Sequence, residues 1–443
     1  MCPTVNNGNH LLTGTGAGSY NTVVLMGCLR LSVRKTYSES ESLLGNREEG
    51  MMMRCSLVVG IALAVLAAQS ASTEQASEWI SLFNGKDLNG WHEVLGGKWS
   101  AKDECIIGET GDGRYGWLVT NDMYSDFVLE LDFKTEAPGN SGVQFRSHVI
   151  KEGPNHDTDR MRGYQAEVNP VRGNATAGVW DEAGDRGWLA KPPRELDDVL
   201  LEGEWNHYRI SMIGDHCVTH LNGVKMVDFH DDKTIRGHIA LQVHSGNTPV
   251  RVRWKNIKIQ DLGYGPGWTP LFNGEDLTGW EPMGNEKWIV ENGAIVGVCV
   301  TDKYGYLATE KTYKDFVVRL KYQCGGGNSG LFFHSSFDEN EELSGGVQSE
   351  IARPEDKHLD GQLYSGRWLT DTSKATYGLV KADEWNDMQV MCKGNRSVTH
   401  VNGYQVADYT DPSPKYTDGV IALQLHSGGQ TSVKFKDIYI KEL

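Results

Sequence analysis

A long internal repeat constrains the fold of this chain more than any other feature. The segment WISLFNGKDLNGW at residues 79–91 returns as WTPLFNGEDLTGW at residues 268–280. Five further segments recur in the same order, ending with IALQVHSG at 239–246 and IALQLHSG at 421–428. The two copies are offset by about 180 to 190 residues, and a repeat of that length is a whole domain rather than a solenoid unit.

Each copy shows the alternation of apolar and polar residues that is typical of half-buried strands, for example at residues 127–133 and 433–440. Asn222-Gly223 and Asn402-Gly403 are strong signals for type I′ hairpins. The sequence offers no long helical stripe, and its 52 glycines and 13 tryptophans suit short strands joined by tight loops. We predict an all-β protein of two tandem antiparallel β-sandwich (jelly-roll) domains, at residues 76–262 and 266–443.

The first 71 residues are predicted to lie outside the folded domains. Residues 1–50 are rich in Asn, Gly, Ser and Thr without a sustained period, and we interpret them as a non-native or disordered upstream extension. Residues 51–71 combine a basic start, an apolar run and a small-residue cleavage site, which is the pattern of a signal peptide. The run is too short for an ordinary transmembrane helix. We therefore expect a protein that is secreted or delivered to the periplasm or cell envelope, with its true start at one of the methionines 51–53.

Charge and cysteine content argue against several classes of function. The formal net charge of −16 disfavours nucleic acid and anionic membrane as partners, since both require a basic surface. Beyond the signal peptide the chain holds five cysteines, an odd number without a CxxC motif. A disulfide framework or a structural zinc site is therefore not expected, although a single pair such as Cys299 with Cys324 remains open.

Strand alternation predicts a set of planar polar residues on one face of each sandwich, because residues two apart in a strand point the same way. The outward pairs are, in copy one, Gln144 with Arg146, Gln165 with Glu167 and Gln242 with His244, and in copy two Phe332 with His334, Gln348 with Glu350 and Gln424 with His426. Amides and guanidinium groups bind sugar hydroxyls in pairs, and the indoles of Trp180, Trp188 and Trp368 could pack on sugar C–H surfaces. This pattern favours a carbohydrate groove over the competing interpretation, a merely hydrated sheet surface.

The loop at residues 179–189 is dense in charged side chains. Its members include Asp181, Glu182 and Arg186. Glu167 with either loop acid could form an acid/base pair assisted by His244, or both acids could be simple exposed turn residues. The counterpart loop at 362–369 keeps an Arg and a Trp and has no acid.

No motif in the sequence requires a cofactor. A group of possible ligands lies close together in the chain, namely His148, His156, Asp157, Asp159 and Glu167. Their spacing matches neither HExxH nor an EF-hand. A divalent cation bound by carboxylates and carbonyls remains open.

As an ordered set, several motifs resemble a known family. LFNGKDLNGW, the YSDF and NSGVQFR strands, GYQAEV, EWN, the LNG turn and ALQVHSG are similar to the 3-keto-disaccharide hydrolase domain family, in both copies. The resemblance implies a concanavalin-A-like lectin/glucanase sandwich and an enzyme that cleaves glycosides already oxidised at C3. Asn169 and Ala352 stand where laminarinase-like members of the fold carry a further acid, so a retaining glucanase is disfavoured.

The resemblance and the predicted faces together suggest roles for individual residues. A C3 ketone acidifies the proton on C2, so one modest general base can start β-elimination of the C1 substituent. We assign Glu167 as the base, Arg146 as the donor to the developing enolate, and His244 or Asp181 as the acid. The side chains expected to bind substrate are Gln144, Gln165, Gln242, Trp180, Glu182, Arg186, His334, Gln348, Glu350, Gln424 and His426.

Two other functions compete with this one. The first is a non-catalytic, lectin-like carbohydrate-binding protein of the cell envelope, since duplication raises avidity for polymers. The second is a structural or protein-interaction module. Copy one keeps more acid/base residues, so we expect it to be the catalyst and copy two to bind or support. The sugar, its linkage, hydrolysis versus elimination and the oligomeric state stay open.

Overall fold

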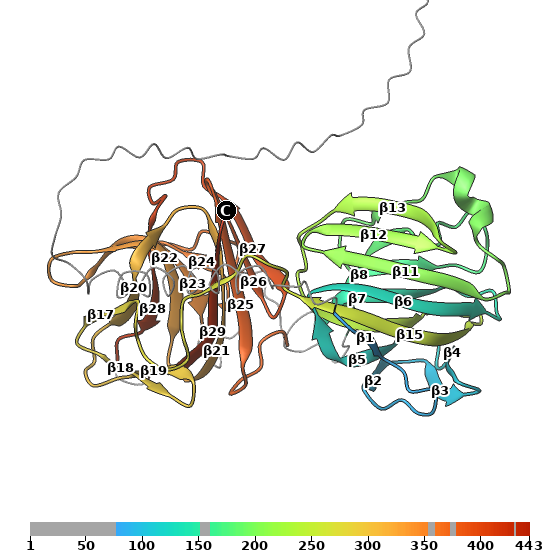
Figure 1. Ribbon diagram of the computed structural model, residues 1–443, viewed down its shortest axis with the longest axis horizontal. Coiled ribbons are helices and arrows are strands. Elements are labelled where there is room, and N and C mark those ends of the chain that lie inside the picture. Colours follow the sequence, from blue (N-terminus) through green and yellow to red (C-terminus); the bar gives the residue numbers. More distant parts are fainter. Residues whose placement is uncertain (1–76, 151–159, 353–358, 373–377, 429–430) are drawn as a thin grey trace, which may run out of the picture. The chain divides into compact units, whose positions relative to one another are not determined.

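The computed structural model describes residues 77–150, 160–352, 359–372, 378–428 and 431–443. The predicted upstream extension and signal peptide lie outside the described residues. Within the described part the chain is built mainly from antiparallel strands (Figure 1). No helix in that part is long and apolar enough to cross a membrane.

Copy one is a sandwich of two antiparallel sheets, which we call the back sheet and the site sheet. The back sheet has the order β13 (Val224–His230), β12 (His216–Leu221), β11 (Asn206–Ile213), β6 (Asp126–Thr135), β15 (Arg251–Gly263), β4 (Cys105–Glu109) and β3 (Lys98–Lys102), with β1 (Trp79–Ser81) paired to β15. The site sheet has the order β10 (Trp188–Ala190), β9 (Val179–Glu182), β8 (Arg160–Val168), β7 (Ser141–Ile150), β14 (Gly237–Val243), β5 (Gly116–Tyr124) and β2 (Trp91–Leu95). A short 3₁₀ helix, η1 (Arg194–Val199), precedes β11.

Copy two repeats this strand order. Its back sheet runs β18 (Lys287–Glu291), β19 (Ala294–Val298), β29 (Ser432–Glu442), β21 (Phe316–Gly326), β25 (Asn386–Lys393), β26 (Arg396–Val401) and β27 (Tyr404–Thr410), with β16 (Thr269–Pro270) paired to β29. Its site sheet runs β17 (Trp280–Gly284), β20 (Gly305–Tyr313), β28 (Gly419–Leu425), β22 (Ser329–Phe337), β23 (Leu343–Ile351) and β24 (Leu363–Tyr364). The prediction of two tandem antiparallel sandwiches is confirmed.

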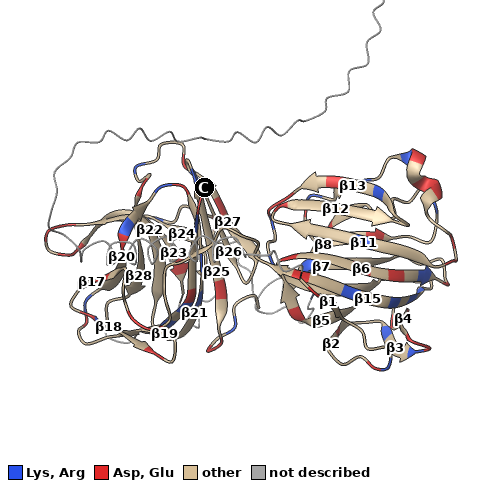
Figure 2. Ribbon diagram, in the orientation of Figure 1, with Lys and Arg blue, Asp and Glu red and all other residues tan. Residues whose placement is uncertain are grey.

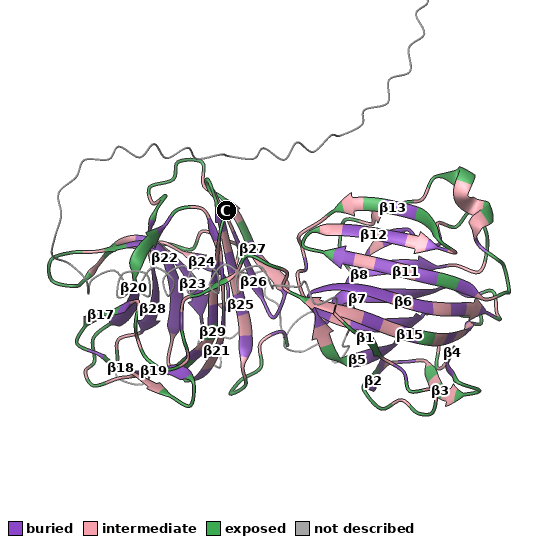
Figure 3. Ribbon diagram, in the orientation of Figure 1, coloured by how far each residue is buried: buried purple, intermediate pink, exposed green. Residues whose placement is uncertain are grey.

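Each core lies between the back sheet and the site sheet, because alternate side chains of the strands point inward. In copy one, Phe127 and Phe133 of β6 belong to the same buried cluster as Phe145 of β7 and Tyr164 of β8. Phe316 takes the place of Phe127 in copy two. Buried residues follow the strands, and exposed residues gather in the loops (Figure 3). Full burial of one such side chain contributes roughly 1.5–3 kcal/mol, so these cores supply most of the stabilisation.

The repeated LFNG…GW segment is explained by local hydrogen bonds. The indole nitrogen of Trp91 donates to the carbonyl of Leu82 at 2.6 Å, and Trp280 donates to Leu271 at the same distance. Within the motif of copy one, Oδ1 of Asn84 accepts hydrogen bonds from the backbone N–H groups of Lys86 and Asp87. These bonds form an Asx turn. The strongest repeat motif of the sequence is therefore structural.

The predicted type I′ hairpins are confirmed in both back sheets. Asn222 and Gly223, between β12 and β13, have φ angles of +50° and +83°. Asn402 and Gly403, between β26 and β27, have φ angles of +49° and +88°. Two consecutive positive φ angles are what this turn requires, and Asn-Gly adopts them at low steric cost.

Charged residues of both signs occur on neighbouring strands of the back sheet of copy one (Figure 2). Glu130 of β6, for example, lies 3.0 Å from Lys258 of β15 and also pairs with Arg209 of β11. Pairs that water reaches contribute only about 0–1 kcal/mol each. The back sheet thus offers ion pairs rather than a block of unpaired charge.

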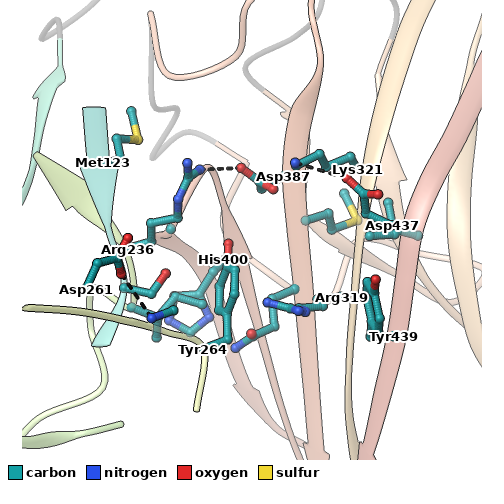
Figure 4. A pocket seen from close by; sticks show the side chains of 17 residues that line it. Met123, Arg236, Asp261, Tyr264, Arg319, Lys321, Asp387, His400, Asp437 and Tyr439 are labelled. Atoms are coloured by element: carbon teal, nitrogen blue, oxygen red, sulfur yellow. Dashed lines mark hydrogen bonds and ion pairs between the residues drawn. The ribbon is translucent and has the colours of Figure 1, made fainter. Parts of the chain in front are cut away.

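A short Gly/Pro-rich linker, residues 261–267, joins the two copies and contacts copy two through an arginine. The guanidinium of Arg319 on β21 lies 3.7 Å from the centre of the Tyr264 ring, 4.6 Å from that of Trp268 and 4.9 Å from that of Tyr439. Arg319, Tyr264 and Tyr439 border a cavity of about 440 Å³ (Figure 4). Desolvation lowers the pKa of Arg319. Since cation–π contacts contribute roughly 0.5–2 kcal/mol, this stack fixes the end of the linker.

Candidate functional site

A buried glutamate stands on the outward face of the site sheet of copy one. Glu167 of β8 is 6% exposed, and it points away from the core because its neighbours Ala166 and Val168 point into it. The amide of Asn140 donates to Oε1 of Glu167, and the amide of Gln165 donates to Oε2 at 3.2 Å. Burial raises the pKa of Glu167 to about 7, against the opposing effect of both amides. Such a carboxyl group can take up and release a proton near neutrality.

A histidine and a tyrosine lie on the same face. His244 directly follows β14, and its Nδ1 donates to the carbonyl of Ser245 at 2.8 Å. A hydrogen on Nδ1 leaves a lone pair on Nε2, which lies 3.3 Å from the hydroxyl of Tyr115. Tyr115 therefore donates to His244. In this tautomer His244 is an acceptor, and it becomes an acid by gaining a proton at Nε2.

Three glutamines surround the glutamate. The amide of Gln144 on β7 donates to Gln165 at 2.7 Å. Gln242 of β14 is fully buried, yet its amide forms no hydrogen bond of normal geometry with any described residue. Leaving a buried polar group unpaired costs about 1–3 kcal/mol. Gln242 is therefore one of the buried groups on this face that a ligand or water can satisfy, together with the indole nitrogen of Trp117.

A second carboxylate, Glu182 of β9, lies at the edge of this face. Its Oε1 is 3.5 Å from Arg160, whose guanidinium also covers the ring of Tyr115 at 5.1 Å. Burial raises the pKa of Glu182, and the charges of Arg160 and His244 oppose that rise. Glu182 and Arg160 thus form a charged edge beside the histidine–tyrosine pair.

Aromatic rings complete the face. Trp117 of β5 stacks on Tyr115 with a centroid distance of 5.5 Å and an interplanar angle of 10°. Trp180, which is paired in register with Gln165, meets Trp188 edge-on at 5.3 Å. Amides beside indole faces are the combination that binds sugar hydroxyls and C–H surfaces.

Copy two repeats the central arrangement. Glu350 of β23 accepts from the amides of Asn328 and, at 2.9 Å, Gln348, and burial raises the pKa of Glu350 to about 7. Nε2 of His426 lies 3.2 Å from the hydroxyl of Tyr304, and Nδ1 donates to the carbonyl of the next residue at 3.0 Å. These five residues line a pocket of about 640 Å³. Both copies therefore hold a buried glutamate with two amide donors and a histidine–tyrosine pair.

A sequence profile described as "3-keto-alpha-glucoside-1,2-lyase-like domain" matches residues 78–260 and again residues 267–441. Together the two matches cover most of the chain. The chain belongs to this family. Membership confirms the resemblance seen in the sequence.

One curated relative is a 3-keto-disaccharide hydrolase of Bacteroides thetaiotaomicron, 24% identical over 172 residues. The match covers 35% of this chain and 59% of the relative, so the chain spans about three-fifths of that protein's length. Among solved structures, a putative glycosyl hydrolase of Parabacteroides distasonis is 26% identical (40% of this chain, 94% of that one, TM-score 0.33). The carbohydrate-binding module CBM66 of Bacillus subtilis is 15% identical (37% and 96%, TM-score 0.28).

Most of the predicted site residues of this family member do lie on the two outward faces. They are Gln144, Gln165, Glu167, Trp180, Glu182, Gln242 and His244 in copy one, and Gln348, Glu350, Gln424 and His426 in copy two. Four other predicted residues do not.

Arg146 was predicted to donate to an enolate, and the structure contradicts this role. A β-bulge shifts the register of β7 after Phe145, and Arg146 has a φ angle of +43°, so the predicted alternation ends there. The buried guanidinium donates to three backbone carbonyls and pairs with Asp126 at 2.8 Å. Arg146 therefore stabilises the fold and points away from Glu167.

His334 sits at the equivalent bulge of copy two, with a φ angle of +48°. Its Nε2 lies 2.7 Å from the carbonyl of Lys314, which corresponds to the carbonyl of Ser125 that Arg146 binds in copy one. The prediction that His334 binds substrate is therefore wrong, since the residue holds the backbone at the bulge.

Asp181 and Arg186 belong to an ion-pair network away from Glu167. Asp181 alternates with Trp180 and Glu182 and so points to the other face of β9. Arg186 lies 2.8 Å from Asp181 and 2.5 Å from Asp231. Burial would raise the pKa of Asp181, but Arg186 and Lys233 outweigh it and the pKa is lowered. Asp181 is thus held ionised, which contradicts its predicted role as an acid, and Arg186 is committed to this network rather than to substrate.

The described residues contain no group of three or more His, Cys, Asp or Glu side chains that could hold a metal ion. His156, Asp157 and Asp159 lie outside the described residues, and His148 is buried with its Nε2 2.7 Å from the carbonyl of Arg236. All five cysteines of the described part are free thiols.

Tyr115 and Asn140 of copy one, with Tyr304 and Asn328 of copy two, were not predicted as site residues. Asn140 and Asn328 begin the repeated NSG motif, and Tyr-Gly recurs at 115–116 and 304–305. The recurrence of these motifs in both copies was therefore the sequence signal that could have identified the four residues. Alternation along a strand could not find them, because all four residues lie just outside the strand ends.

Proposed function

We propose that this chain cleaves 3-keto-glycosides by general acid/base chemistry on the site sheet of copy one, with Glu167 as the base. The observation that carries the proposal is a carboxyl group whose pKa burial raises to about 7, on one face with a histidine–tyrosine pair. The family profile and the 3-keto-disaccharide hydrolase relative support this substrate class.

A base of this pKa suits the removal of a proton next to a ketone. Glu167 takes the proton from C2, and the electrons of the C–H bond form an enolate with the C3 carbonyl. Collapse of the enolate makes the C1–C2 double bond and breaks the C1–O bond, which releases the aglycone oxygen with its electron pair. Addition of water to C1 would convert this elimination into net hydrolysis.

His244 and Tyr115 are suited to the proton that the leaving oxygen needs. Protonated at Nε2, His244 can give that proton to the leaving group directly or through the tyrosine hydroxyl. Glu182 lies close enough for its charge to stabilise the imidazolium. The amide of Gln242, which forms no hydrogen bond of normal geometry with a described residue, replaces Arg146 as the candidate donor to the enolate oxygen.

We also propose that the protein is exported. The support is the order of a basic start, an apolar run and small residues at 51–71. Amino-terminal sequencing of the mature protein tests this, and a mature chain that retains residues 1–50 would contradict it.

The test of the catalytic proposal is the double variant Glu167→Gln/Glu350→Gln, assayed with a 3-keto-disaccharide. Removal of a general base lowers turnover by roughly 100- to 10,000-fold, and we expect a loss in that range. Glutamine keeps an acceptor oxygen for Asn140 and Asn328, so the fold should persist, as thermal unfolding can verify.

Asp181→Asn serves as the matched control, because it removes a carboxylate of the neighbouring strand β9 that does not face Glu167. Its turnover should stay within about twofold of the original protein. Full activity of the double variant would overturn the proposal, and sugar binding without any turnover in the original protein would favour the lectin-like alternative.

A further inference from the structure

The two sites share their base but differ in the residues around it. On β8 of copy one, Gln165 is paired in register with Gln144. On β23 of copy two, the corresponding Gln348 is paired with Phe332. An amide that donates to the neighbouring glutamine in copy one is thus replaced by an aromatic ring.

The charged edge of copy one has no counterpart in copy two. Gly163 and Gly346, with φ angles of +144° and +140°, mark equivalent points in the two copies. Counting back three residues aligns Arg160 with Leu343. On the next strand, Gln165 is paired with Trp180 and Gln348 with Tyr364. Two residues further along, Glu182 of copy one therefore corresponds to Gly366 of copy two. Leucine and glycine here remove an ion pair, and both line the pocket of copy two.

A longer loop brings a further ring to this pocket. The segment from Asp408 to Gly419 is two residues longer than its equivalent at 228–237, and it contributes Lys415 and Tyr416 to the pocket lining. The ring of Tyr416 lies against Gly345, where a Cβ would come within 2.3 Å of it. Glycine at this position is therefore required for Tyr416 to lie where it does.

The result is a pocket with an aromatic wall beside the base. Tyr306 meets Phe332, which stands where copy one has Gln144, edge-on at 5.5 Å. Tyr364 meets Trp368 edge-on at 5.3 Å, as Trp180 meets Trp188 in copy one, so Phe332 and Tyr416 are the rings that distinguish copy two. Trp368 is 41% exposed although it is a large apolar side chain. Rings in such arrangements receive another ring by stacking or edge contact.

We propose that copy two is a second active site, which acts on 3-keto-glycosides with an aromatic aglycone, while copy one acts on those whose aglycone is a sugar. The inference rests on the proposed function, because Glu350 would carry out the step assigned to Glu167. The aromatic wall of copy two binds the aglycone ring, and the charged edge of copy one meets sugar hydroxyls.

The chemistry of the leaving group agrees with this division. A phenol has a pKa of about 10, well below that of a sugar hydroxyl, so an aryloxide leaves with less help from an acid. Glu350 takes the C2 proton, the C1–C2 double bond forms, and the C1–O bond breaks with its electrons on the aryloxide. The aryloxide then gains a proton from His426 or water, so no oxidant or reductant is involved. In copy one, Glu182 supports the imidazolium that acts as the acid. Copy two has glycine at that position, and an aryloxide leaving group needs less help from an acid.

The decisive experiment uses the whole chain with two substrates, a 3-keto-disaccharide and a nitrophenyl 3-keto-glucoside. Glu350→Gln should lower turnover of the aryl substrate about 100-fold or more and leave the disaccharide within about twofold. Glu167→Gln should do the reverse. If Glu167→Gln abolished both activities and Glu350→Gln neither, copy two would not be an active site and the proposed function would stand. If the double variant retained both activities, the proposed function itself would fail.

The aromatic wall is tested by Tyr416→Ala with Tyr416→Phe as its matched control. Loss of the ring should raise KM for the aryl substrate roughly two- to tenfold with kcat nearly unchanged, while phenylalanine keeps the ring and KM. Gly345→Ala, which displaces Tyr416, should act like Tyr416→Ala. Equal KM values in all three variants, or an equal rise for the disaccharide, would overturn the assignment of the aglycone.

Discussion

Burial and hydrogen bonding oppose each other at the two site glutamates. Burial destabilises the ionised carboxylate, while the amide donors of Asn140 and Asn328 stabilise it. The balance leaves both carboxyl groups with a pKa of about 7. Each asparagine is therefore a positioning residue that acts on the pKa of the base.

This balance predicts the pH dependence of catalysis. The base must be ionised to accept a proton, so kcat/KM should rise with pH along a limb whose midpoint lies near pH 7. Asn140→Ala removes a hydrogen bond to the charged form, so the pKa of Glu167 should rise by roughly one unit, as a loss of ~1.5 kcal/mol implies. The measurement is kcat/KM for a 3-keto-disaccharide between pH 5 and 9 in a Glu350→Gln background.

A merely structural role for Asn140 would lower the plateau without moving the midpoint. Asn328→Ala in the same background is the matched control, because it alters the other copy and should leave the profile unchanged.

At the scale of single elements, the bulge in β7 decides which side chains reach the site. Arg146 and Asp126 form an ion pair buried behind the sheet, with side-chain exposures of 1% and 10%. Removal of one partner leaves an uncompensated buried charge, which typically costs about 3–5 kcal/mol.

Arg146→Leu should therefore lower the free energy of unfolding of copy one by about that amount, with little change in kcat at temperatures where the protein stays folded. Denaturant unfolding followed by tryptophan fluorescence measures the loss. The double variant Arg146→Leu/Asp126→Leu should regain much of it, because no lone charge is left. A selective loss of kcat in Arg146→Leu would restore the enolate role that the bulge geometry argues against.

The same elements show what a sequence can and cannot predict. Alternation placed Gln165 and Glu167 correctly because β8 keeps its register through both residues. It failed at Arg146 and His334, since a bulge moves the side chain without leaving a hydrophobic mismatch in the sequence. It also missed Tyr115 and Asn140, which come from strand ends and meet the site only through the fold.

Across the whole molecule, buried ionisable groups link stability to pH in opposite senses. Burial raises the pKa of Asp360 in copy two to about 8, despite a hydrogen bond from the hydroxyl of Tyr322. The folded state then keeps a proton that the unfolded chain loses above about pH 4. The contribution of Asp360 to the free energy of unfolding therefore falls as pH rises from about 4 to 8. Burial lowers the pKa of His148 to about 3 and of His400 to about 4, so their contribution falls as pH drops below 6.5.

Asp360→Asn isolates the first of these effects. The free energy of unfolding of the variant, relative to that of the original protein, should rise by a few kcal/mol from pH 5 to pH 8.5. One pKa unit corresponds to about 1.4 kcal/mol. Urea unfolding at both pH values measures the difference, in which the histidine contributions cancel. A difference that does not change with pH would show that Asp360 is already ionised in the folded protein.

The pairing of first and last strands gives the molecule an order of assembly. Trp79 of β1 lies opposite Gln260 of β15, and Thr269 of β16 lies opposite Ile440 of β29. Neither back sheet can acquire its first strand until nearly the whole copy has been synthesised, and contacts so distant in sequence slow folding. Copy one can close while copy two is still on the ribosome, whereas copy two must wait for its final residues. The same pairing brings the two ends of each copy together, so that a further copy can be appended in series without opening the one before it.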